Sequence, residues 1–132
     1  MPSVRINKDR EGGDYLRIFV VDDEKPCLDE LVYMLSKQED MEIVGAFTNP
    51  VKAFEALADL KPDAAFLDLS MTRLNGAQLA ARMHANSPAL KIVFVTAYAK
   101  ELAKLGDSPT VGSLLKPVSE AKLQELLRRI SD

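Results

Sequence analysis

Residues 18–23 are Ile18-Phe19-Val20-Val21-Asp22-Asp23, an apolar run that ends in two aspartates. About forty-five residues later the pattern recurs as Ala64-Ala65-Phe66-Leu67-Asp68. Short apolar runs of this kind are typical of strands that are buried on both faces of a parallel sheet. In one such sheet the three carboxylates would gather at the same edge, where they repel one another unless a cation lies among them.

Short apolar runs alternate with amphipathic stretches five times from Leu16 onward. This alternation predicts an α/β fold, a parallel sheet with helices on both faces. The strands are expected at residues 16–21, 42–47, 64–69, 91–96 and 111–115. Helices are expected after each of them, starting near Pro26, after the cap Asn49, after Asn75-Gly76, near Lys100 and at the cap Ser119.

Length and composition favour one domain. The chain has 132 residues, a net charge of -3 and dispersed Lys and Arg, so direct binding of nucleic acid is not expected. No apolar run is long enough to cross a membrane. Cys27 is the only cysteine, which excludes an internal disulfide and fits a reducing compartment, and we expect a cytoplasmic protein. Residues 1–14 are interpreted as a flexible polar leader and residues 15–132 as the domain.

Five polar side chains fall at the ends of predicted strands. Binding sites in open parallel sheets form beyond the carboxyl ends of the strands, where the strand order reverses. Taken singly, each such residue is more often a helix cap or a turn residue. Together they predict a functional site at one mouth of the sheet. The five residues are Asp22, Asp23, Asp68, Thr96 and Lys116.

This set suits the transfer of a phosphoryl group to a carboxylate. Carboxylates are ligands for the hard cation Mg²⁺. A metal, an ammonium and a hydroxyl placed around a phosphoryl group stabilise its charged oxygens. We therefore interpret Asp68 as the nucleophile that forms an aspartyl phosphate, Lys116 as the ammonium and Thr96 as the hydroxyl.

With these motifs the chain resembles the receiver domains of two-component response regulators. The resemblance covers about Leu16 to Ser131, and its ordered motifs are highly specific as a set. Among receivers it is most similar to those of LytTR-type or related transcriptional regulators. The motifs are Val21-Asp22-Asp23-Glu24, Pro62-Asp63-Ala64-Ala65-Phe66-Leu67-Asp68, Asn75-Gly76, Val95-Thr96-Ala97 and Leu115-Lys116-Pro117.

The resemblance implies a flavodoxin-like (CheY-like) doubly wound five-stranded parallel sheet of order 2-1-3-4-5. It implies a phosphohistidine of a sensor histidine kinase, or a phosphotransfer protein, as the donor, and an output domain or effector protein as the target. It also implies a signalling module that catalyses only its own phosphorylation and dephosphorylation and is no separate enzyme, with homodimerisation as an option. The implied roles are Asp68 as phosphoacceptor; Asp22, Asp23, Asp68 and the backbone carbonyl of Ser70 as Mg²⁺ ligands; and Thr96 and Lys116 as phosphoryl-binding groups.

Three departures from the family pattern fall after the predicted acceptor. Thr72 stands where the family usually has a proline, and Ser113 stands where it usually has an aromatic switch residue. The stretch from Thr96 to Lys116 is short and contains Pro109, which predicts a reduced fourth helix. The usual coupling of the switch hydroxyl to an aromatic ring is therefore expected to be absent.

Two further expectations concern this region. Tyr98 is a candidate substitute for the aromatic switch, and its ring is expected to cover the aspartyl phosphate and prolong its lifetime. The charges of Lys100, Glu101 and Lys104 are interpreted as a solvated helix face.

Two alternative functions stay open. A degenerate receiver that acts only as a protein-binding module is compatible with Thr72, Ser113 and the short fourth helix. An aspartate-nucleophile phosphatase of the haloacid dehalogenase type is compatible with Asp68 and Thr72, although that family needs an aspartate where this chain has Ser70.

Overall fold

The computed structural model describes residues 15–72, 74–106, 108 and 110–131. They form a parallel sheet of five strands in the order β2-β1-β3-β4-β5, which confirms the predicted fold class. The leader at residues 1–14 and Pro109 lie outside the described residues. The strands are β1 (Leu16–Val21), β2 (Met41–Phe47), β3 (Ala64–Asp68), β4 (Lys91–Thr96) and β5 (Gly112–Leu115). The helices are α1 (Lys25–Ser36), α2 (Pro50–Leu60), α3 (Gly76–Asn86), α4 (Ala99–Ala103) and α5 (Glu120–Ser131).

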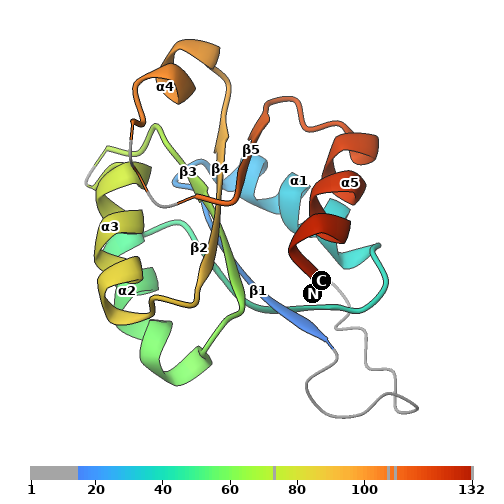
Figure 1. Ribbon diagram of the computed structural model, residues 1–132, viewed down its shortest axis with the longest axis horizontal. Coiled ribbons are helices and arrows are strands. Elements are labelled where there is room, and N and C mark those ends of the chain that lie inside the picture. The colour runs from blue at the N-terminus through green and yellow to red at the C-terminus, as the bar shows by residue number, and fades with distance from the viewer. Residues whose placement is uncertain (1–14, 73, 107, 109, 132) are drawn as a thin grey trace.

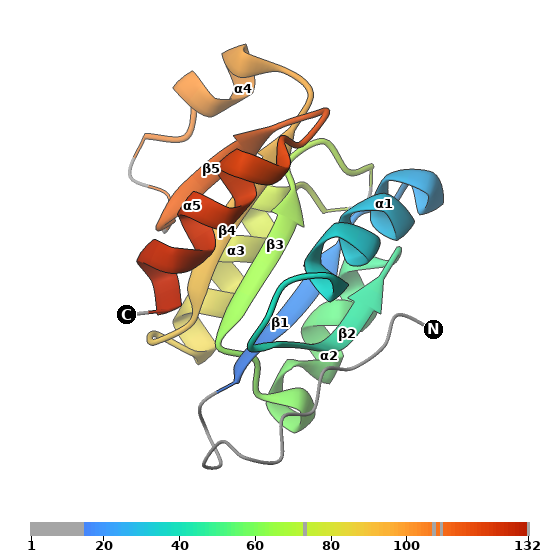
Figure 2. The same cartoon turned by 90° about the vertical axis from the view of Figure 1, so that its right-hand side faces the viewer.

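Helices cover both faces of the sheet. The helices α1 and α5 lie against one face, and α2 and α3 lie against the other (Figures 1 and 2). The short helix α4 projects beyond the end of β4 (Figure 1). Within the described part of the chain, no helix has the length and apolarity that a membrane span requires.

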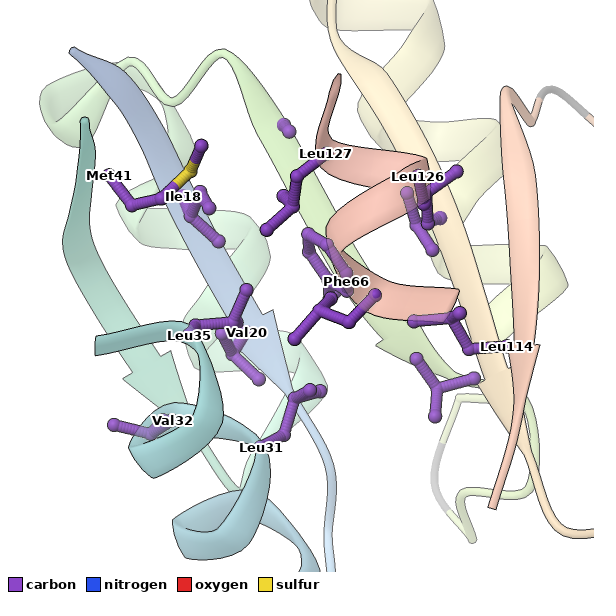
Figure 3. Packing of buried hydrophobic residues seen from close by; sticks show 14 of the residues in the cluster. Ile18, Val20, Leu31, Val32, Leu35, Met41, Phe66, Leu114, Leu126 and Leu127 are labelled. Carbon is purple, nitrogen blue, oxygen red and sulfur yellow. The ribbon is translucent and has the colours of Figure 1, made fainter. Parts of the chain in front are cut away.

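The central strands are buried on both faces because successive side chains point to opposite sides of the sheet. Ile18 and Val20 pack with Phe66 in the cluster under α1 and α5, as Figure 3 shows. Phe19 and Val21 belong to the separate cluster under α2 and α3. Burial of a ring such as that of Phe66 stabilises the fold by about 2–3 kcal/mol.

Side-chain caps fix where three helices begin. Asn49 accepts hydrogen bonds from the N–H groups of Val51 and Lys52 at 2.9 and 3.3 Å, as its position before Pro50 predicts. Asn75 and Gln78 form a reciprocal capping box at the start of α3. Ser119 Oγ accepts from the N–H of Lys122 at 3.3 Å, in agreement with its predicted role as the cap of α5.

The fourth helix is reduced, as predicted. The helix α4 has 5 residues and none of them is buried, whereas α2 and α3 each have 11. Three strand boundaries differ by one residue from the prediction, because β2 begins at Met41, β3 ends at Asp68 and β5 begins at Gly112. The ends of β1, β4 and β5 are as predicted, and Asp68 is the last residue of β3.

Candidate functional site

The three aspartates meet where the strand order reverses. The strands β1 and β3 are neighbours in the sheet, and Val21 pairs with Leu67, so the residues that follow end at one edge. Asp22, Asp23 and Asp68 each offer a carboxylate oxygen, and these oxygens lie within 4.8 Å of one another. Such a set of oxygen ligands fits a hard divalent cation.

Lys116 joins this cluster from the end of β5. Its Nζ donates to Asp22 Oδ2 at 2.8 Å and lies 3.5 Å from Asp68 Oδ1. Burial alone lowers the pKa of Lys116, but the hydrogen bond to Asp22 and the charges of Asp22 and Asp68 outweigh it and raise the pKa. Lys116 is therefore a cation that faces the acceptor carboxylate.

The surroundings of Asp68 disfavour the ionised form of its carboxyl group. Asp68 is 4% exposed. Burial and then the charge of Asp22 raise its pKa to about 6, although Lys116 and the N–H of Ser70 act in the opposite direction. Since Lys116 leaves negative charge uncompensated, a further cation at this edge would stabilise the ionised form.

Gly76 allows α3 to begin directly beside the acceptor. A Cβ atom at this position would lie 2.4 Å from the carbonyl oxygen of Asp68 and 2.8 Å from the Cα of Leu69. The N–H of Gly76 donates to the carbonyl of Leu69 at 3.2 Å. The Asn75-Gly76 motif thus combines a helix cap with a contact that only glycine permits.

The residue at the usual proline position contacts the acidic pair. The N–H of Thr72 donates to Asp23 Oδ2 at 3.1 Å, and its hydroxyl lies 3.4 Å from the same oxygen. A proline has no N–H and would lose the first of these bonds. The departure at Thr72 therefore ties the loop after β3 to Asp23.

The carboxylate of Glu101, in α4, lies at the same end of the sheet. Both oxygens of Glu101 accept from Ser70 Oγ at 2.7 Å, and Glu101 Oε1 also accepts a short hydrogen bond from Thr96 Oγ1. These bonds from Thr96 and Ser70 lower the pKa of Glu101. The prediction of a solvated helix face is therefore wrong for Glu101, because this side chain turns toward the end of β4.

Ser113 and Tyr98, the two positions that bear on the aromatic switch, are both exposed. Ser113 lies in β5 and is exposed. The Tyr98 ring is 62% exposed, although Tyr98 lines the cleft at the acidic edge. Its backbone N–H donates to Thr96 Oγ1 at 3.2 Å. Since residue 113 is a serine, a conformational signal from Thr96 to the surface has to pass through other contacts.

The described residues form a cleft of about 680 Å³ at this edge. Its lining includes five of the six predicted site residues together with Tyr98, and the sixth, Thr96, is buried and lies between the lining residues Val95 and Ala97 in the sequence. A larger cleft of about 1230 Å³ lies at the opposite end of the sheet, and none of the predicted site residues lines it. The residue types at the smaller cleft favour it as the functional one. Its five predicted lining residues are Asp22, Asp23, Asp68, Ser70 and Lys116.

Comparison with known proteins identifies the class of protein. Residues 18–128 match the family model of the response regulator receiver domain, and the chain therefore belongs to this family. It is 34% identical over 115 residues to the transcriptional regulatory protein BtsR of Escherichia coli, which covers 87% of this chain and 48% of BtsR. It is also 34% identical over 114 residues to the sensory transduction protein LytT of Bacillus subtilis, covering 86% of this chain and 47% of LytT. The resemblance to LytTR-type receivers is thereby confirmed.

The solved structures agree. The response regulatory domain of mrkE from Klebsiella pneumoniae superimposes with a TM-score of 0.78 at 28% identity, covering 87% of this chain and 94% of that domain. The chain spans about half the length of the curated relatives it matches.

Proposed function

We propose that this domain accepts a phosphoryl group on Asp68 and thereby switches the output of a response regulator. The observation that carries the proposal is the contact of Lys116 with Asp22 and Asp68 within the cluster of three carboxylates at the ends of β1 and β3. A buried acceptor, a facing ammonium and a site for a divalent cation are the parts that phosphoryl transfer to a carboxylate requires.

The proposed step is a displacement at phosphorus. A carboxylate oxygen of ionised Asp68 forms a bond to phosphorus while the bond from phosphorus to an imidazole nitrogen of the kinase, or of a phosphotransfer protein, breaks. The electron pair of the broken bond stays on that nitrogen. The product is a mixed anhydride on Asp68, and the phosphoryl charge spreads over three oxygens near Lys116 and Thr96.

Each neighbouring group has a proposed role in this step. Lys116 Nζ attracts the phosphoryl oxygens, and the hydroxyl of Thr96 donates a hydrogen bond to one of them. Mg²⁺ would be held by Asp22, Asp23, Asp68 and the backbone carbonyl of Ser70. When bound, it supplies positive charge that offsets both the carboxylates and the incoming phosphoryl group.

The family relationship supports a wider proposal for the whole protein. We propose that the donor is a sensor histidine kinase or a phosphotransfer protein in the cytoplasm. The output is proposed to be transcriptional, through an output domain or an effector protein, because BtsR is a transcriptional regulatory protein. Homodimerisation on phosphorylation is a further part of this proposal. The domain is proposed to act as a signalling module and not as an enzyme with its own turnover substrate.

Mass spectrometry after incubation with acetyl phosphate and Mg²⁺ tests the acceptor directly. We expect one added phosphoryl group on the wild type and none on Asp68→Asn. Asp59→Asn, on the exposed face of α2, is the matched control and should be phosphorylated like the wild type. No adduct on the wild type would favour the degenerate receiver. Continuous hydrolysis of a phosphate ester would favour the phosphatase.

A further inference from the structure

Glu101 connects the two hydroxyls that border the phosphoryl site. Ser70 follows the acceptor by two residues, and Thr96 ends β4 beside it. Both hydroxyls donate to the carboxylate of Glu101 in the protein described here. Two strand ends and α4 are thus joined through one side chain.

Phosphorylation would compete for one of these bonds. A threonine hydroxyl has a single proton to donate, so Thr96 cannot donate to Glu101 and to a phosphoryl oxygen at the same time. A phosphoryl group would also place negative charge near the Glu101 carboxylate, and like charges at short distance repel each other. Both effects favour breaking of the hydrogen bond between Thr96 and Glu101.

Movement of Glu101 would be passed to the first turn of α4. Glu101 is only five residues from Thr96 in the sequence, and its N–H donates to the carbonyl of Tyr98 at 3.0 Å. The N–H of Tyr98 in turn donates to Thr96 Oγ1 at 3.2 Å. No residue of α4 is buried, and Leu102 is the α4 side chain that packs against the cluster under α2 and α3, so little packing opposes such a movement.

We propose that Glu101 is a positioning residue that holds Thr96 and Ser70 in the unphosphorylated protein and releases α4 when Asp68 is phosphorylated. The inference rests on the function proposed for Asp68, because the phosphoryl group is what displaces Glu101. It gives the domain a route from the active site to its surface that needs no aromatic residue at position 113.

Two variants separate this role from a merely structural one. Glu101→Gln keeps the size of the side chain but removes its charge, and Glu101→Ala removes both oxygens. Glu55→Gln is the control, because Glu55 is an exposed glutamate on α2, away from the cleft. Acetyl phosphate with Mg²⁺ is used as the donor, so that docking of a kinase does not enter the result.

Freeing Thr96 should speed phosphorylation. We expect Glu101→Ala to be phosphorylated roughly two- to tenfold faster than the wild type, the range that corresponds to loss of one hydrogen bond, and Glu101→Gln, whose amide oxygen still accepts a hydrogen bond, to be accelerated less. Hydrogen exchange of the amides of residues 98–105 should also rise in the unphosphorylated variants and should rise in the wild type only on phosphorylation. Glu55→Gln should match the wild type in both measurements.

A double-mutant comparison tests whether Glu101 acts through Thr96. Thr96→Val removes the hydroxyl and is expected to slow phosphorylation, but adding Glu101→Ala to it should then change the rate by less than it does in the wild type. The same rate ratio in both backgrounds, or wild-type exchange and rate in Glu101→Ala, would overturn the proposal. If the wild type itself acquires no phosphoryl group on Asp68, the function proposed above fails, and this inference fails with it.

Discussion

The acidic edge and the α4 edge of the sheet are built in different ways. At the acidic edge the carboxylates of Asp22 and Asp68 follow strands that are buried on both faces, and both residues are almost fully buried. At the α4 edge a helix of 5 residues without a buried side chain leads to β5, an edge strand with one buried residue. The proposed chemistry thus lies on the more buried part of the fold, and the departures from the family pattern at Ser113 and in α4 lie on the less packed part.

The largest expected effect is on the free energy of unfolding, and it is tested by replacing one glycine at each edge. Gly76→Ala places a methyl group against backbone atoms that have little freedom to move, and we expect it to lower the free energy of unfolding by about 2–3 kcal/mol. Gly106→Ala meets no atom within 4 Å but must adopt a φ of 57°, which costs about 1 kcal/mol. Denaturant unfolding of both variants measures the difference. Equal losses would show that the acidic edge is less rigid than described here.

A smaller effect is expected from the charge of Asp68 and can be read from the pH dependence of stability. Its pKa is raised from 3.8 to about 6, so the folded state binds the proton more tightly than the unfolded state does. The stability that protonated Asp68 contributes is therefore complete below about pH 4 and is lost as the pH rises through 6.

Asp68→Asn should consequently be more stable than the wild type at pH 7.5 in the presence of a chelator. The expected gain in the free energy of unfolding is about 1–2 kcal/mol, after allowance for solvent screening. The gain should vanish near pH 4 and should shrink when saturating Mg²⁺ stabilises the wild type. A gain that is independent of pH would contradict the assignment to this carboxyl group.

The smallest expected effect lies at the α4 edge. Because Tyr98 is 62% exposed, we expect it to shield an aspartyl phosphate only partly, and Tyr98→Ala should shorten the lifetime of the phosphoryl group by about twofold. The rate of phosphoryl loss from purified phosphorylated protein measures it. Tyr33→Ala is a matched control, since that ring is also 62% exposed but belongs to α1. If the two variants lose the phosphoryl group equally fast, Tyr98 has no shielding role.

The fold and the spatial proximity of the candidate site residues could be predicted from the sequence. Apolar runs predicted the strands, and the rule for strand ends placed Asp22, Asp23, Asp68, Thr96 and Lys116 at one edge, where the structure has them. These predictions succeed because strand ends depend on burial patterns, which are local in the sequence. The roles of these residues in phosphoryl transfer stay predictions until the adduct is measured.

Contacts made by loops could not be predicted from the sequence in the same way. The bond from Thr72 to Asp23 and the approach of Gly76 to Asp68 depend on the path of the loop after β3, which no periodicity specifies. Glu101 was missed because a charged residue on a short helix has the same pattern whether it faces water or a hydroxyl. The hydroxyl of Thr96, which is buried and needs an acceptor, is the signal that favours an acid nearby.

The absence of buried residues in α4 also bears on how such domains diversify. Within Ala99–Ala103, Leu102 packs against the hydrophobic cluster under α2 and α3, and none of the five residues is buried. Selection on the other positions of this segment can therefore act on partner recognition with little penalty in folding. In this way, domains with the same type of reaction centre can acquire different binding partners through substitutions in one short surface helix.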